Sequence, residues 1–372
     1  DEKNVLEVIR NTGIDLPTFC YYSELSIYGA CRMCIVEDKW GNIFTSCSQI
    51  PKEGMVISTQ TPKLRRYRKN ILELLLASHD RDCTSCNITG RCDLQKLARR
   101  FGIEKIRFGE FDKKLPIDDA SHSIVRNPNK CIYCGDCVRV CEEVQGIGAL
   151  SFTHRGSDLR ISPAFNKSIN DVHCVGCGQC RIVCPTGAIT VKNDREAFWD
   201  VVWDKDKRVV AQIAPAVRVA LGERFGLEAG EITIGKIVAS LKKIGVDEVY
   251  DTAFAADMTV IEESQEFVDR LTSGENLPLF TSCCPGWTKF AEYKYPELEK
   301  NISTCKSPQQ MFGAVVKEYY KDKDKGDGKE TIMVSVMPCT AKKAEAAREE
   351  FENDGIRDVD IVITTNELAR II

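Results

Sequence analysis

The stretch CIYCGDCVRVC, residues 131–141, has a counterpart in CVGCGQCRIVCP at residues 174–185. In both stretches the cysteines are separated by two, two and three residues. Cysteines at this spacing can direct several thiolates at one iron–sulfur cluster. Because the pattern occurs twice, it weighs strongly against chance and against a zinc site. The sequence therefore predicts a domain built around two clusters.

The paired runs resemble those of bacterial two-cluster ferredoxins. In that fold the fourth cysteine of each run binds the cluster of the other run. The resemblance implies two [4Fe-4S] clusters, one held by Cys131, Cys134, Cys137 and Cys184 and the other by Cys174, Cys177, Cys180 and Cys141.

The composition of the whole chain fits a metal-binding protein of several domains. The 372 residues are 43% hydrophobic and 28% charged, with a net charge of -4. Nineteen cysteines in so long a chain indicate metal binding rather than a disulfide scaffold. This usage predicts a cytoplasmic protein. The absence of a run of about 18 apolar residues argues against a membrane span, and the acidic balance argues against a nucleic-acid binder.

Two further ligand sets precede the double run. Four cysteines have the spacing C-x10-C-x2-C-x12-C, which suits a [2Fe-2S] cluster or, alternatively, zinc: Cys20, Cys31, Cys34 and Cys47. A histidine and three cysteines have the spacing H-x3-C-x2-C-x5-C, and zinc is again the alternative: His79, Cys83, Cys86 and Cys92.

The segment between these two sets has helical periodicity. Residues 61–77 carry apolar side chains at helical spacing, with Pro62 at a favoured first position. The basic run at residues 63–69 is interpreted as a solvated helix face, in preference to a docking patch for a partner. Before this helix, residues 34–37 and 55–58 have the composition of short strands.

The two upstream sets also resemble known modules. The stretch YYSELSIYGACRMCIVE, residues 21–37, resembles the ferredoxin-like module of complex I large subunits and hydrogenases, and the histidine set resembles their [4Fe-4S] module. The resemblance implies a multidomain α+β protein. Its domains would be a β-grasp [2Fe-2S] module at 1–62, a small helical histidine-ligated module at 63–113, a two-[4Fe-4S] ferredoxin module at 114–200 and part of an α/β domain at 201–372.

Strands and helices alternate from about residue 208, which indicates an α/β domain. Strands are predicted at 209–215 and 248–254, and helices at 231–244 and 259–271. The apolar runs LPLFTSC and TIMVSVMPC are each predicted to be a strand that ends at a cysteine, where open parallel sheets place their sites. The charged stretch at 321–329 is predicted to be a surface loop.

Three motifs in this domain carry a further resemblance: TSCCPGW at 281–287, KSPQQ at 306–310 and MPCTAKKAE at 337–345. They look like the signatures of iron-only ([FeFe]) hydrogenases. Taken alone, Cys283 and Cys284 could be two small buried residues after a strand. Hydrogen cleavage needs a metal, a base beside it and an exit for electrons, and thiolates can hold such a metal.

The resemblance implies a role for individual residues. Cys284 and Cys339 would bind the cubane of the hydrogen-activating cluster (the H-cluster), Cys283 would relay the proton, and Lys342 would hold a cyanide ligand. The remaining pocket would be lined by Ala214, Pro215, Ser307, Gln309 and Met337. The proton path would comprise Glu263, Glu266, Arg270 and Ser303, although the first three form a helical stripe that on sequence alone is a solvated face. Cys305 is expected to be a buried structural thiol.

The same resemblance suggests what the protein does. The four ligand sets resemble the catalytic subunit of multimeric, NAD(P)-linked, electron-bifurcating hydrogenases, with flavin- and NAD(P)-binding subunits and ferredoxin as partners. The chain has no G-x-G-x-x-G fingerprint, so nucleotide binding is assigned to another subunit. The alternatives are a monomeric ferredoxin-linked hydrogenase, a non-catalytic subunit like that of complex I, and a hydrogen sensor.

Both ends of the sequence are expected to lie inside a longer protein. The chain begins at Asp1, and residues 365–372 have a helical composition without a stop signal. A third family motif, with two more cysteines for the active cluster, would lie beyond Ile372. We therefore expect no sustained turnover from these 372 residues alone.

Overall fold

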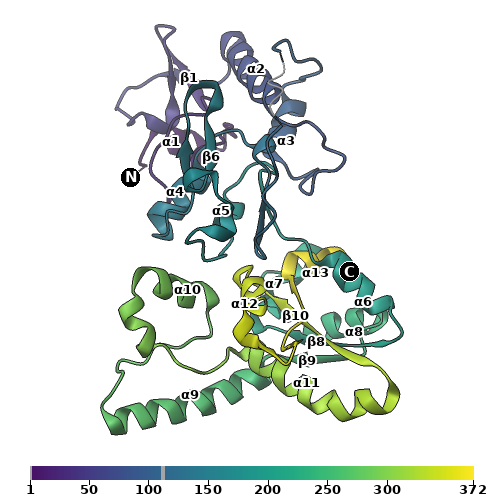
Figure 1. Ribbon diagram of the computed structural model, residues 1–372. Coiled ribbons are helices and arrows are strands. Elements are labelled where there is room, and N and C mark those ends of the chain that lie inside the picture. Colours follow the sequence, from purple (N-terminus) through teal and green to yellow (C-terminus); the bar gives the residue numbers. More distant parts are fainter. Residues whose placement is uncertain (1, 110–113) are drawn as a thin grey trace. The chain divides into compact units, whose positions relative to one another are not determined.

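The computed structural model describes residues 2–109 and 114–372. The chain forms two compact units (Figure 1). Unit 1 contains residues 2–109, 114–120, 125–174 and 179–190, and unit 2 contains residues 121–124, 175–178 and 191–372. The predicted domain boundary between residues 113 and 114 touches the stretch outside the described residues.

Unit 1 begins with a three-stranded antiparallel sheet and one short helix. Helix α1 (Val5–Asn11) precedes strands β1 (Ile35–Asp38), β2 (Ile43–Thr45) and β3 (Ile57–Ser58), and the strand order is β2-β1-β3. The predicted strand residues 34–37 and 55–58 thus fall in or beside β1 and β3. Helix α1 was not predicted, because seven residues are too few to establish a helical period.

Helix α2 (Pro62–Ala77) forms where the periodicity predicts it. The Thr61 side chain caps it by accepting a hydrogen bond from Leu64 N, and a proline stands in the first turn. The prediction that the basic run is a solvated face is wrong for Arg68, which is 3% exposed. Its position is four residues from both Leu64 and Leu72, so it lies on the buried stripe of the helix.

The rest of unit 1 consists of short elements joined by loops. Helix α3 (Asp93–Arg100) packs against α2 through Leu72, Leu94 and Leu97. Two two-stranded sheets follow, β4-β7 and β5-β6. The remaining elements are β4 (Ile124–Arg126), α4 (Asp136–Arg139), a π-helical turn (Val140–Val144), β5 (Ser151–Thr153), β6 (Arg160–Ser162), α5 (Gln179–Ile182) and β7 (Ile189–Val191).

Unit 2 is built on a parallel sheet with the order β13-β10-β8-β9. Its strands are β8 (Lys207–Ile213), β9 (Glu248–Asp251), β10 (Glu330–Met337) and β13 (Ile361–Thr364). Its helices are α6 (Arg195–Trp203), α7 (Pro215–Ala220), α8 (Ile234–Ile244), α9 (Ala253–Ser273), α10 (Pro285–Lys294), α11 (Pro308–Asp327), α12 (Ala341–Ala346) and α13 (Thr365–Ile371). A small hairpin joins β11 (Glu352–Asn353) to β12 (Ile356–Arg357).

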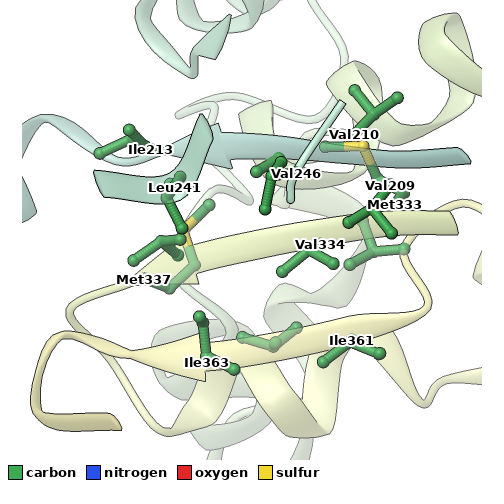
Figure 2. Packing of buried hydrophobic residues seen from close by; sticks show 14 of the residues in the cluster. Val209, Val210, Ile213, Leu241, Val246, Met333, Val334, Met337, Ile361 and Ile363 are labelled. Carbon is green, nitrogen blue, oxygen red and sulfur yellow. The ribbon is translucent and has the colours of Figure 1, made fainter. Parts of the chain in front are cut away.

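The core of unit 2 lies on this sheet. Figure 2 shows Val210, Met333 and Val334 of the central strands beside Ile363 of β13 and Leu241 of α8. All five side chains are fully buried. Strands β8 and β10 are buried nearly throughout, as expected for parallel strands that are covered on both faces.

Several predicted elements of unit 2 are confirmed and two are wrong. Strands β8, β9 and β10 and helices α8 and α13 occur within a few residues of the predicted ranges, whereas α9 begins six residues before the predicted helix at 259–271. The run LPLFTSC is not a strand of the sheet, because only Phe280 makes an isolated bridge, to Ile302. The charged stretch at 321–329 is mostly helical, since α11 continues to Asp327.

A close backbone approach makes Gly313 of α11 sensitive to substitution. A Cβ atom there would lie 2.2 Å from the carbonyl oxygen of Asp358, whereas one on Gly326 of the same helix would meet nothing within 4 Å. We expect Gly313→Ala to lower the free energy of unfolding by about 1–3 kcal/mol. Gly326→Ala, the matched control, should raise it by about 0.4–1 kcal/mol. Chemical unfolding of both variants checks this, and equal effects would contradict it.

Candidate functional site

The four cysteines of the first ligand set form two close pairs. The Cys31 amide lies 3.4 Å from Cys20 Sγ. A hydrogen bond from the Cys20 thiol lowers the pKa of Cys31 to about 7, and one from the Cys47 thiol lowers the pKa of Cys34 to about 6. Cys20, Cys34 and Cys47 are each 1% exposed. The structure therefore brings the four predicted thiols together as two close pairs, with Cys20, Cys34 and Cys47 buried and Cys31 partly exposed.

His79 has the chemistry of a metal ligand. Burial lowers the pKa of its imidazole to about 4, so the ring is neutral at physiological pH, which is the form that binds metals. Its Nδ1 atom is buried and has no hydrogen-bond partner among residues 2–109 and 114–372. Since buried polar atoms are nearly always paired, this orphaned nitrogen fits a missing metal bond.

The cysteines that accompany His79 lie against the end of the second cysteine run. Cys92 is 8% exposed, and burial raises the pKa of its thiol. A Cβ atom on Gly187 would lie 2.8 Å from Cys86 Sγ. The amide of Asp93 donates to the carbonyl of Pro185 over 3.1 Å. Only glycine at position 187 therefore leaves room for the Cys86 sulfur.

One cubane set of the double run surrounds a single cavity. Its four predicted cysteines, three from the first run and Cys184 from the second, all line this cavity together with apolar side chains such as Ile132 and Ile161. Burial raises the pKa of Cys131 to about 12. A thiolate in this place needs a positive counter-charge, which bound iron would supply. The donor set and its surroundings thus fit a [4Fe-4S] cluster.

The other cubane set comprises Cys141 of the first run and three cysteines of the second run, Cys174, Cys177 and Cys180. The Cys141 sulfur accepts a hydrogen bond from Ala149 N at 3.3 Å. The ligand role of these four residues stays a prediction.

No three histidine, cysteine or acidic side chains in the described ranges are arranged to hold a single metal ion. The four ligands of an iron–sulfur cluster are distributed over two or four iron atoms, so they need not converge on one point. The fit to clusters therefore depends on the donor sets themselves, on the orphaned His79 nitrogen and on the cavity lined by four cysteines.

In unit 2, several predicted pocket residues lie at one edge of the sheet. Ala214 follows β8 directly, and its amide donates to the carbonyl of Val336 over 3.0 Å. Met337 is the last residue of β10, and Cys339 follows two residues later. Because the two strands are parallel, their carboxyl ends deliver these residues to the same edge. Pro215 begins α7 there and is exposed.

A buried carboxylate that the sequence analysis did not single out links four of the predicted residues. Glu345 is 4% exposed and accepts hydrogen bonds from Ser307 Oγ at 3.0 Å and Gln309 Nε2 at 2.9 Å. It pairs with Lys342, whose Nζ also donates to the carbonyl of Cys283 at 2.8 Å. Burial raises the pKa of Glu345 in spite of this pairing. The i,i+3 spacing of Lys342 and Glu345 within MPCTAKKAE is the signal that could have found it.

The cysteines of TSCCPGW are placed on the surface of unit 2. Cys283 and Cys284 are both exposed, just before α10, so they are not the buried pair of the alternative interpretation. Within the described residues no hydrogen bond joins the Cys283 thiol to Glu263. The Glu263 Oε1 atom is buried and has no partner in that part of the chain. The structure thus leaves the first step of the predicted proton path open.

The other three residues of the predicted proton path, Ser303, Glu266 and Arg270, are joined by hydrogen bonds. Glu266 accepts a hydrogen bond from Ser303 Oγ at 2.7 Å and pairs with Arg270 at 2.6 Å. Burial raises the pKa of Glu266, but the hydrogen bonds from Ser303 and Thr304 and the charge of Arg270 outweigh it, so the pKa lies below its ordinary value. The interpretation of this stripe as a solvated face is wrong, because Glu266 and Arg270 side chains are only 15% and 11% exposed.

A cavity of about 390 Å³ lies between the two networks. Its lining includes Ser303, which bonds Glu266, and Ser307, which bonds Glu345. Cys305 also lines it, and its sulfur lies 3.8 Å from Glu266 Oε2. Cys305 is half-buried, so the expectation of a buried structural thiol is wrong. The volume suits a small-molecule or cofactor site.

Family profiles match four successive stretches of the chain. They are described as a 2Fe-2S iron-sulfur cluster binding domain at residues 1–62, the NADH-ubiquinone oxidoreductase-G iron-sulfur binding region at 68–107 and a 4Fe-4S dicluster domain at 130–188. The fourth is the C-terminal domain of the iron-only hydrogenase large subunit, at 207–372. Residues 207–372 belong to the iron-only hydrogenase family.

Curated relatives support the family over nearly the whole sequence. NADP-reducing hydrogenase subunit HndD of Solidesulfovibrio fructosivorans is 44% identical over 99% of this chain. Iron hydrogenase 1 of Clostridium pasteurianum is 36% identical over 100% of it. The periplasmic [Fe] hydrogenase large subunit of Nitratidesulfovibrio vulgaris is 42% identical over 55% of this chain and 56% of its own length. The chain spans 65% of the length of each of the first two relatives.

The hydrogen bonds and the ion pair of Glu266 are expected to stabilise the protein in a pH-dependent way, because they lower the pKa of this carboxyl. A carboxyl whose pKa is lowered by folding stabilises the protein above its unfolded pKa, and that contribution is lost as the pH falls through the folded pKa. We expect Glu266→Gln to lower the free energy of unfolding by about 1–3 kcal/mol at pH 7. The difference should shrink as the pH is lowered below 4.5, the ordinary value.

Unfolding of both proteins at equal cluster loading across this pH range measures the effect. Glu262→Gln, at an exposed position of the same helix, is the control and should have little effect at any pH. If Glu266→Gln lowers the free energy of unfolding by the same amount at pH 4 and pH 7, the ionised carboxylate of Glu266 is not the form that stabilises the protein.

Proposed function

We propose that this chain is the electron-relay part and the first part of the catalytic domain of an [FeFe]-hydrogenase subunit, which catalyses reversible hydrogen oxidation and proton reduction. The observation that carries the proposal is the coexistence of four ligand sets with the Lys342–Glu345 network at the sheet edge. A non-catalytic subunit like that of complex I would need the ligand sets but not this network. The presence of a cysteine at position 283 argues against a hydrogen sensor, because such sensors commonly have another residue in place of the relay cysteine.

The relay would comprise one [2Fe-2S] and three [4Fe-4S] clusters. The facing cysteine pairs at the N-terminus suggest that each iron of the [2Fe-2S] cluster takes one pair. The cubanes would be held by the histidine set, by the cavity lined by four cysteines, and by the set of Cys141, Cys174, Cys177 and Cys180. This arrangement corresponds to the β-grasp, histidine-ligated and two-cluster modules at 1–62, 63–113 and 114–200 that the sequence predicts.

The active cluster would be held in part by Cys284 and Cys339, beside the pocket formed by Ala214, Pro215, Ser307, Gln309 and Met337. When bound, that cluster supplies the site at which hydrogen is polarised and split. Lys342 would offer a positive charge to its diatomic ligands, and Glu345 would hold the Lys342 ammonium in place at 3.0 Å. The Cys283 thiol would accept or donate the proton, and Ser303, Glu266 and Arg270 would conduct it onward from Glu263.

The relay implies a partner at its far end. One relative is named as a subunit of an NADP-reducing hydrogenase, which favours the multimeric, NAD(P)-linked and electron-bifurcating type with flavin-binding subunits and ferredoxin. The monomeric ferredoxin-linked type is the second candidate, because Iron hydrogenase 1 also matches the whole chain. No helix among the described residues is long and apolar enough to cross a bilayer. Purification of the native complex and analysis for bound flavin separates these candidates.

The proposed ligand role of His79 is tested by substitution. His79→Cys should retain all the iron, about 14 atoms per chain, because thiolate is also a cluster ligand. Thiolate adds negative charge where imidazole is neutral, so the midpoint potential of one cubane should become more negative. An anaerobic redox titration followed by electron paramagnetic resonance, with iron analysis, measures both. His154→Ala is the control, and unchanged midpoints in His79→Cys would remove the histidine from the ligand set.

The proposed proton relay is tested in the complete hydrogenase chain. A thiol transfers protons better than an alcohol or a methyl group because its pKa lies closer to the operating pH. Cys283→Ala should therefore lose about 100-fold or more in both hydrogen uptake and evolution, while the cluster bound through Cys284 and Cys339 is retained. Gas chromatography of hydrogen and iron analysis measure the two properties. Near-normal turnover at full cluster content would place the relay elsewhere.

A further inference from the structure

Arg68 occupies a position where an apolar side chain is expected. It lies on the buried stripe of α2 between Leu64 and Leu72, which are both fully buried, and its own exposure is only 3%. The neighbouring Arg65 and Arg66 are exposed. A long charged side chain is almost never fully buried without a partner of opposite charge. The burial of Arg68 therefore calls for a counter-charge.

Backbone carbonyls satisfy the hydrogen bonds of Arg68 but not its charge. Its Nε donates to the carbonyl of Met33 at 3.1 Å, its Nη1 donates to the carbonyl of Thr59 at 2.9 Å, and its Nη2 donates to the carbonyl of Ile35. No carboxylate among the described residues pairs with it. Carbonyl dipoles cannot neutralise a full positive charge, and burial of an unpaired guanidinium is costly.

The first ligand set lies next to the carbonyls that Arg68 contacts. Two of the three carbonyls belong to Met33 and Ile35, the residues on either side of Cys34. Burial lowers the pKa of Arg68 to about 10, and the charge of the Cys34 thiolate opposes this shift. The guanidinium therefore stays charged at physiological pH, in direct contact with the loop that presents Cys34.

We propose that Arg68 is the buried counter-ion of the iron–sulfur cluster held by Cys20, Cys31, Cys34 and Cys47, and that it raises the reduction potential of that cluster. This inference rests on the [2Fe-2S] assignment made under the proposed function. A four-thiolate [2Fe-2S] cluster gains one negative charge when it takes up an electron. A fixed positive charge nearby stabilises the reduced form more than the oxidised form.

The burial of Arg68 distinguishes it from the other cations of the same helix. A charge removed from water acts on its surroundings with little screening, whereas an exposed charge is weakened by water and salt. Arg65 and Arg66 should therefore affect the cluster little. Arg68 also ties α2, which ends two residues before His79, to the Cys34 loop. It is thus a positioning residue as well as a counter-ion.

The test compares three variants in the anaerobically reconstituted full chain. A redox titration followed by electron paramagnetic resonance gives the midpoint of the [2Fe-2S] signal beside those of the cubanes. Arg68→Gln should shift the [2Fe-2S] midpoint to a more negative potential and leave the cubane of Cys131, Cys134, Cys137 and Cys184 unchanged. Arg68→Lys, which keeps the charge, should stay closer to the wild-type midpoint. Arg65→Gln, the matched control, should not move it.

The remaining outcomes decide the proposal in the same experiment. A wild-type midpoint in Arg68→Gln with full [2Fe-2S] content overturns it. If Arg68→Gln does not assemble the cluster, the Arg68→Lys variant decides between the two roles. A midpoint near that of the wild type supports the role of Arg68 as a counter-ion. Failed assembly, or a midpoint far from that of the wild type, assigns Arg68 a geometric role only. An absent [2Fe-2S] signal in the wild-type chain would overturn the cluster assignment itself, which separates that failure from a failure of the Arg68 proposal.

Discussion

The parallel hydrogen-bonded register between β8 and β10 is the constraint on which the geometry of unit 2 depends. Val336 pairs with Ile213, so the two strands end side by side. The segments that follow the two strands therefore begin at the same edge of the sheet. For this reason Ala214, after β8, and Cys339, after β10, lie at one edge although they are far apart in the sequence. Helix α12 starts from this edge, and Glu345 on it receives the side chains at the start of α11. A shift in register would separate all of these contacts.

Unit 1 is organised by a different principle, because its cysteine loops have little regular structure. Buried side chains hold these loops by their backbone carbonyls. Arg139 donates to the carbonyl of Cys20 at 3.0 Å and pairs with Asp136, just as Arg68 donates to the carbonyls beside Cys34. Fixed guanidinium groups thus replace the hydrogen bonds that a sheet or helix would provide. Two buried arginines thus fix the backbone at Cys20 and beside Cys34.

The sequence was sufficient where a pattern repeats or a run is mainly apolar. The cysteine spacing predicted that the first three cysteines of the first run act together with Cys184, and these four residues line one cavity; the mainly apolar runs predicted β8 and β10. It was insufficient where tertiary contacts override local composition. No local pattern shows that Arg68 is buried or that LPLFTSC lacks strand partners, and the i,i+3 spacing of Lys342 and Glu345 indicates an ion pair but not the contacts of Glu345 with Ser307 and Gln309. The charged stretch after residue 321 is helical because α11 begins far upstream, under the Ser307 cap.

The chain enters unit 2 before its main segment begins, through residues 121–124 and 175–178. Thr340, which follows Cys339, joins both insertions: its hydroxyl donates to the carbonyl of Gly176 at 2.7 Å, and its carbonyl accepts from Ser123 Oγ at 3.0 Å. Recombination of genes at the apparent boundary near residue 200 would therefore remove both of these contacts from unit 2. In evolution and in protein engineering alike, residues 121–124, residues 175–178 and the main segment of unit 2 would have to be inherited as one exchangeable block.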